Sequence, residues 1–170
     1  GGNLERPGEN EVDVLVDELS ARLLGSPPDC SATVIAIKAL DTARSDLSIR
    51  SAVTALVYVA ADDDTQAVEY LEQAYYSRRK NVFLASSLLS ALGLLGLRSA
   101  PARAGAIRYL LRLNAGDPRP LLVAGAKTIG ILCDRQDVPT LRKKLIKLAK
   151  NDDAAVRAEA LQQVALLKFA

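Results

Sequence analysis

Residues 152–167 read Asp-Asp-Ala-Ala-Val-Arg-Ala-Glu-Ala-Leu-Gln-Gln-Val-Ala-Leu-Leu. Counted from Val156, apolar side chains recur four, five, eight, nine and eleven residues further on. This spacing places them on one face of an α-helix. Two aspartates precede the apolar run, at positions where carboxylates are solvated and a side-chain oxygen can cap the first free amides. The stretch therefore predicts an amphipathic helix that buries one face against other parts of the protein.

The same apolar template begins at three earlier points in the chain. The starts are Leu121, Leu84 and Ile49, so that successive copies are separated by 35, 37 and 35 residues. The ninth residue after the start is small in the last three copies, where it is Gly93, Gly130 and Ala165. A small residue at this position allows a neighbouring helix to approach closely. Four copies in register predict a repeat architecture.

Further helices are predicted between these copies from their own start signals. Acidic residues stand before one of them, and prolines occupy the first turns of two others. The expected helices cover residues 11–24, residues 31–43, Thr65 to about Tyr76, the region of Pro101 to Leu113, and the region of Pro139 to about Lys150. Together with the four copies, they make roughly nine helices in a single domain over residues 11–170. Residues 1–10 are expected to be flexible.

Composition agrees with an all-α fold. Apolar residues make up 49% of the chain, but aromatic residues only 4%, and Ala and Leu dominate the apolar set. Ala and Leu favour helices, whereas strands favour β-branched and aromatic residues. One pair of helices cannot bury its apolar face alone, so each pair must stack on the next. We therefore expect a right-handed superhelix (a solenoid) of about four helix pairs, with an inner and an outer surface.

The repeat resembles the HEAT-repeat family over roughly residues 31–168. The resemblance rests on Asp-Asp-Ala-Ala-Val-Arg at 152–157 followed by Ala160 and Leu161, on Ser-Asp-Leu-Ser-Ile-Arg at 45–50, and on Asp-Pro at 117–118. The copy at 81–84 departs from it, since it lacks the acidic residue and the Arg, and its helix is expected to be more deeply packed. The resemblance implies that Arg50 and Arg157 support stacking between repeats.

Several kinds of chemistry are excluded or disfavoured by composition. The chain has no His, so it holds no catalytic triad and no imidazole ligand for zinc or haem. Cys30 and Cys133 are single and far apart, and we interpret both as small buried apolar residues. The run Asp62–Asp64 lacks the spacing of a calcium loop and is interpreted as a solvated helix start. We expect no enzyme activity, no cofactor and no metal.

Charge is distributed unevenly along the chain. Residues 1–97 hold 8 Lys and Arg against 14 Asp and Glu, a net charge of −6, whereas residues 98–170 hold 14 against 6, a net charge of +8. The basic half concentrates its cations on two helices that are each the second of a pair, and second helices of HEAT-like pairs line the concave side. The predicted basic stripe comprises Arg108, Arg112, Arg142, Lys143, Lys147 and Lys150, with Lys144 in the same crowded segment. The alternative interpretation is an ordinary solvated face.

Tyrosines offer a second candidate surface. Tyr75 shares an apolar stripe with Val68 and Leu71 and is predicted to pack in the core, whereas Tyr76 should be exposed. Tyr and Arg are frequent anchors of protein interfaces. Tyr76, Arg79 and Tyr109 therefore join the residues expected to contact a partner.

Three functions are compatible with these observations. The first is a scaffold or adaptor module that binds a protein or peptide on the concave face, and an acidic partner is one candidate. The second is binding of nucleic acid or another anionic surface through the basic half. The third follows only from the resemblance, because some HEAT-like proteins are bilin lyases. We expect a cytoplasmic protein without a transmembrane segment, and the lack of Met indicates a piece of a larger chain.

Overall fold

The computed structural model describes residues 30–60, 65–77 and 80–168, and these ranges contain eight helices and no strand. The protein is therefore all-α throughout the described ranges, as composition predicts. The predictions for residues 1–10, residues 11–24, Asp62–Asp64 and Arg79 lie outside them. The chain divides into two compact units between Tyr70 and Leu71, and each unit is described by itself.

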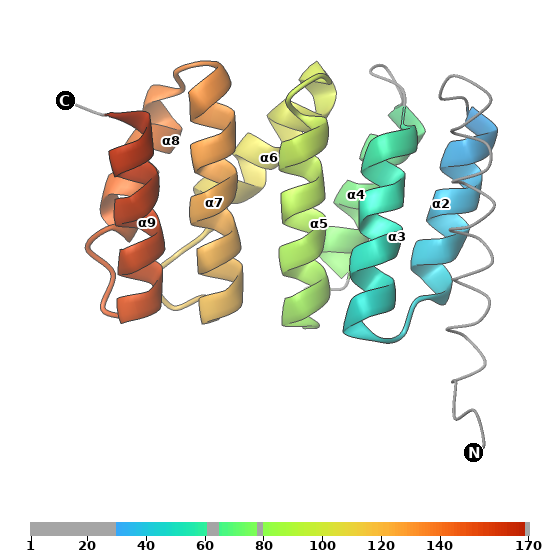
Figure 1. Ribbon diagram of the computed structural model, residues 1–170, viewed down its shortest axis with the longest axis horizontal. Helices are drawn as coiled ribbons and strands as arrows, with labels where there is room; N and C mark the ends of the chain where they lie inside the picture. Colours follow the sequence, from blue (N-terminus) through green and yellow to red (C-terminus); the bar gives the residue numbers. More distant parts are fainter. Residues whose placement is uncertain (1–29, 61–64, 78–79, 169–170) are drawn as a thin grey trace. The chain divides into compact units, whose positions relative to one another are not determined.

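The first unit contains α2 (Cys30–Thr42), α3 (Asp46–Val59) and the beginning of α4 (Thr65–Ser77). Ser45 caps α3, because its hydroxyl accepts a hydrogen bond from the amide of Ser48 at 3.1 Å. Helices α2 and α3 pack side by side (Figure 1), and small and branched side chains on them, among them Ala39, Leu40 and Leu56, are buried. A hydrogen bond from the hydroxyl of Tyr70 to Asp41 ties α4 to α2.

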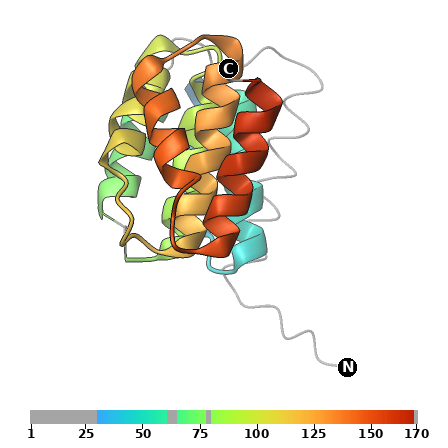
Figure 2. The ribbon, with the colours of Figure 1, turned by 90° about the vertical axis from the view of Figure 1, so that its left-hand side faces the viewer.

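The second unit contains the rest of α4 and five further helices. They are α5 (Val82–Leu95), α6 (Ala100–Arg112), α7 (Arg119–Arg135), α8 (Pro139–Leu148) and α9 (Ala154–Leu167). Helices α5, α7 and α9 stand side by side in one row, and each packs on the next (Figure 1). Helices α6 and α8 lie on one side of that row and contact each other, as the end view shows (Figure 2). The second unit is thus a two-layer arrangement of alternating helices.

Capping explains where several of these helices begin. The side chains of Asn81, Ser99 and Asp153 each accept a hydrogen bond from an amide in the first turn of the following helix. The predicted prolines stand in the first turns of α6 and α8, where their missing amide costs nothing. Helix α8 ends at Leu148, slightly before the predicted end near Lys150.

The four predicted copies of the apolar template all begin at a buried residue. Their first residues are all buried, with exposed fractions of 5% for Ile49, 5% for Leu84, 7% for Leu121 and 0% for Val156. Helix α5 buries most of its length, which confirms the deep packing expected from its uncharged sequence. Residues spaced by the period of about 35 residues are therefore alike in their burial as well as in their apolar character.

The small residues of the template do allow close approach. A Cβ atom on Gly93 of α5 would collide with the side chain of Thr128 on α7, and one on Gly130 of α7 would collide with the side chain of Gln163 on α9. The corresponding Ala165 of α9 is exposed, because no described helix packs there. The prediction is confirmed for the two glycines, whereas Ala165 marks an uncovered position.

Candidate binding site: a basic cleft between α6 and α8

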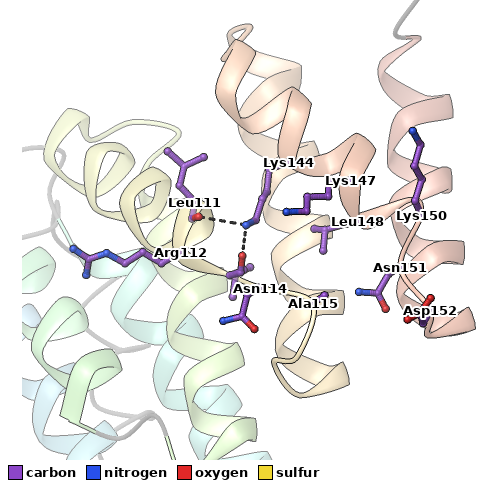
Figure 3. A pocket seen from close by; sticks show the side chains of 11 residues that line it. Leu111, Arg112, Asn114, Ala115, Lys144, Lys147, Leu148, Lys150, Asn151 and Asp152 are labelled. Carbon is purple, nitrogen blue, oxygen red and sulfur yellow. Dashed lines mark hydrogen bonds between the residues drawn. The ribbon is translucent and has the colours of Figure 1, made fainter.

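A cleft of about 450 Å³ lies where the C-terminal end of α6 meets α8 and the loop after it. Its walls combine basic, polar amide and apolar side chains, which are shown in Figure 3. The lining residues are Leu111, Arg112, Leu113, Asn114, Ala115, Lys144, Lys147, Leu148, Lys150, Asn151 and Asp152. The cleft lies entirely within the second unit.

A sharp turn after α6 forms one wall of this cleft. The amide of Asn114 donates to the Asp117 carboxylate at 2.9 Å, and the side-chain oxygen of Asn114 accepts from the amide of Gly116 at 3.0 Å. This Asx turn ends α6 and directs the chain toward α7. It leaves the carbonyl groups of Leu111 and Leu113 at a helix C-terminus, where the dipole attracts cations.

Lys144 of α8 occupies that position. Its Nζ donates hydrogen bonds to the carbonyl oxygens of Leu111, at 3.3 Å, and Leu113 (dashed lines in Figure 3). Burial lowers the pKa of the Lys144 ammonium, the nearby charge of Lys147 lowers it further, and Asp117 opposes the shift. The ammonium group of Lys144 therefore already binds two backbone carbonyl groups, and it links α8 to the end of α6.

Lys147, Lys150 and Arg112 supply the remaining positive charge of the cleft. Figure 3 shows Lys147 pointing toward Lys144, while Arg112 extends away from the lysines. Among the described residues, Lys147, Lys150 and Arg112 form no ion pair, and all three are exposed. They can therefore attract an anionic ligand without first breaking an internal ion pair.

The apolar part of the cleft is available as well. Leu111 is 41% exposed, and Leu148 and Leu113 contribute the more buried surface beneath the lysines. Asp152 at the rim is the one carboxylate among the lining residues. A ligand that fits this cleft presents negative charge to the lysines and an apolar group to the leucines.

The structure separates the other residues of the predicted basic stripe from this cleft. Arg108 forms an ion pair with Glu72 and lies over the ring of Tyr109 at 5.6 Å. Arg142 forms an ion pair with Asp137 at 3.6 Å. Lys143 is exposed but does not line the cleft. Part of the stripe is therefore neutralised by ion pairs, and of the predicted set only Arg112, Lys147 and Lys150 line the cleft.

The predicted tyrosines form a second surface next to Arg112. Tyr75 is buried and its ring packs against that of Tyr109, with 4.6 Å between ring centroids, whereas Tyr76 is 69% exposed. Both predictions are confirmed. Tyr76 and Tyr109 line an open depression, and Arg112 lines a small recess together with Tyr75, Tyr76 and Tyr109. Arg112 thus contributes to the cleft and to the tyrosine surface.

Lys144 is the one basic residue lining the cleft that the sequence analysis did not select as a partner-binding residue. Its position is nevertheless visible in the sequence, because it follows the buried Leu141 by three residues and precedes the buried Leu145. A lysine that borders a core stripe is held close to the neighbouring element, whereas Lys143 points further into solvent. The turn residues Asn114 and Asn151 carry no charge, and charge patterning alone does not find them.

Other kinds of site receive no support in the described ranges. Burial raises the pKa of the free Cys133 thiol, which is unsuited to nucleophilic chemistry. Groups of three or more His, Cys, Asp or Glu that could hold a metal ion do not occur among the described residues. None of the helices there has both the length and the apolar character needed to span a bilayer.

Comparisons with known proteins returned no match to a family model, a curated protein or a solved structure.

Proposed function

We propose that this chain is a protein-interaction module of the HEAT-like solenoid type, and that it binds an acidic segment of a partner protein in the cleft between α6 and α8. The observation that carries the proposal is the pair of exposed lysines, Lys147 and Lys150, that stand without internal ion pairs beside the apolar surface of Leu111 and Leu148. In a HEAT-like solenoid, the second helix of each pair lines the concave face, and α6 and α8 are the second helices of their pairs.

The free energies of single contacts indicate how large the bound segment of the partner must be. An exposed ion pair contributes roughly 0.2–1 kcal/mol, and full burial of one Leu or Phe side chain contributes about 1.5–3 kcal/mol. Two ion pairs and one apolar anchor together contribute roughly 2–5 kcal/mol, which at most balances the loss of translational and rotational freedom, a cost of about 4–15 kcal/mol. The partner must therefore extend beyond the cleft, and the exposed Tyr76 near Arg112 is the adjoining surface that can receive it.

Fluorescence anisotropy with a dye-labelled peptide tests this proposal. The peptide alternates Glu and Asp around a central Phe, and a second peptide carries Gln and Asn in their place. The double variant Lys147→Glu with Lys150→Glu should weaken binding of the acidic peptide by about tenfold or more, a change of about 1.4 kcal/mol. The neutral peptide should bind weakly to both proteins.

The matched control is the double variant Lys127→Glu with Lys143→Glu. It makes the same change in net charge at exposed positions outside the cleft. Equal weakening by both double variants would show that the peptide senses only overall charge, and the cleft would then lose its assigned role.

Nucleic-acid binding is the second candidate, and it is favoured by the net charge of +8 over residues 98–170. Against it, Arg108 and Arg142 are paired with carboxylates, and Asp152 stands at the rim of the cleft. Single-stranded nucleic acid also requires several stacking rings. Tight binding of a labelled oligonucleotide, with affinity that falls steeply as salt rises, would favour this candidate over the acidic peptide.

A further inference from the structure

Lys144 differs from the other cations of the cleft because the protein itself holds its ammonium group in place. The side chain is half-buried, and its Nζ atom donates to the carbonyl oxygens of Leu111 and Leu113. An ammonium group has three N–H donors, so these two contacts leave one of them. Because Lys144 also lines the cleft, the third donor is available to a group that enters it.

The charge of this ammonium group is not balanced by an ion pair. Its two acceptors are uncharged, and among the described residues it forms no ion pair with a carboxylate. Lys147, three residues further along α8, points toward it in Figure 3. Burial and the charge of Lys147 lower the pKa of Lys144, and Asp117 does not cancel the effect. An anion placed between the two lysines would therefore be attracted by both.

We propose that one carboxylate of the acidic partner segment lies between the ammonium groups of Lys144 and Lys147 and accepts the third N–H of Lys144. This inference rests on the proposed function, and it gives Lys144 a role in binding in addition to its link between α6 and α8. Lys144 suits that role because its side chain is already held, so that binding costs little further rotamer freedom. Lys150 and Arg112 are exposed, and a ligand must order them first.

The apolar surface beside this position limits what the neighbouring residue of the ligand can be. Leu148 lies beside Lys147 in Figure 3, and Leu111, whose carbonyl oxygen binds Lys144, is 41% exposed. A residue next to the bound carboxylate therefore meets leucine side chains, and their burial by an apolar group is favourable. The segment that binds here should thus place an acidic residue next to a large apolar one.

NMR titration of the lysine side chains, with and without the acidic Phe-containing peptide, tests this inference. A carboxylate beside an ammonium group favours its charged form, so the peptide should raise the pKa of Lys144. Lys143 is the internal control, because it is exposed on the same helix and does not line the cleft. Its side-chain resonances should change little when the peptide is added.

Three variants measure what the charge at position 144 contributes to binding. Lys144→Met should weaken binding of the acidic peptide about fivefold, as expected for the loss of one good ion pair. Lys143→Met makes the same change in net charge outside the cleft and should have little effect. Lys144→Arg keeps a charged donor and should restore most of the affinity. Fluorescence anisotropy of the labelled peptide gives all three affinities.

The results separate this inference from the proposed function. If the peptide binds but leaves the pKa of Lys144 unchanged, or if Lys144→Met binds it as tightly as the original protein, the inference is overturned and the proposed function stands on Lys147 and Lys150. If the peptide does not bind at all, both fail. A raised pKa of Lys144, with loss of affinity in Lys144→Met and recovery in Lys144→Arg, supports the contact.

Discussion

At the scale of single residues, small side chains decide how closely the helices of the second unit pack. A Cβ atom added at Gly93 would collide with the Cγ2 atom of Thr128. The side chain of Thr128 is buried and β-branched, so it cannot move aside easily. A Cβ atom added at Gly130 would collide with the terminal amide of Gln163, which is the far end of a flexible and half-buried side chain. Two glycines at equivalent positions of the repeat thus face neighbours that differ in their ability to yield.

Substitution of these glycines by Ala should separate the two cases. Gly93→Ala should lower the free energy of unfolding by about 1–3 kcal/mol, the usual cost of overpacking a core. Ala favours the helix by about 1 kcal/mol over Gly at both positions, so Gly130→Ala should cost less only because Gln163 can turn its amide into solvent. Urea denaturation of both variants measures the difference. Equal effects would mean that the neighbours do not set the cost.

The contacts of Asp153 lead to a second testable prediction, because they shift the pKa of its carboxyl group. Its carboxylate accepts a hydrogen bond from Arg119 Nε at 2.7 Å, and this contact, joined by the capped amides of Ala155 and Val156, lowers the pKa of the carboxyl. A carboxyl with a lowered pKa in the folded state stabilises the fold above its ordinary pKa. That contribution is lost as pH falls through the folded value.

Replacement of Arg119 by Met should therefore raise the pKa of Asp153 toward the ordinary value. Carboxyl-detected NMR titration of the two proteins reports this pKa directly. The variant should also lose stability at neutral pH, and the difference from the original protein should shrink in acid. An unchanged titration of Asp153 would show that the two side chains do not interact in solution.

At the scale of helices, Lys144 holds α8 against the end of α6. Lys144→Met keeps the length of the side chain but removes the donor to the carbonyl oxygens of Leu111 and Leu113. We expect a loss of about 1 kcal/mol in the free energy of unfolding, because those carbonyls can still reach water. Hydrogen exchange should quicken in the last turn of α6, while α9 keeps its protection. Uniform loss of protection would argue against a local role.

The helices themselves were well predicted from the sequence, for physical reasons. Each copy of the template places its apolar residues on one side, and residues such as Ser99 and Pro101 mark the starts without help from distant contacts. Side-chain partners were harder to predict. That Arg108 meets Glu72, and that Arg142 meets Asp137, depends on how separate segments pack. The sequence therefore indicated a basic surface but not which of its cations remain unpaired.

Arg157 illustrates the same limit. The resemblance to HEAT repeats implies that this arginine supports stacking between repeats. In the structure its guanidinium group binds the carbonyl oxygens of Asn151 and Asp152, in the loop that precedes its own helix. The link between α7 and α9 comes instead from Arg119 and Asp153. Arg157 has a structural role, but the contact is local.

At the scale of the whole molecule, the cleft between α6 and α8 is the surface that we propose binds a partner. All the described residues that line it belong to the second unit.

NMR titration of the isotopically labelled protein with the acidic Phe-containing peptide tests this claim most directly. The largest changes in amide chemical shift should fall in residues 111–115 and 144–152, with smaller ones near Tyr76 and Tyr109, and few in α5 or α9. Changes spread evenly over the exposed lysines and arginines, or confined to residues outside these segments, would contradict the claim.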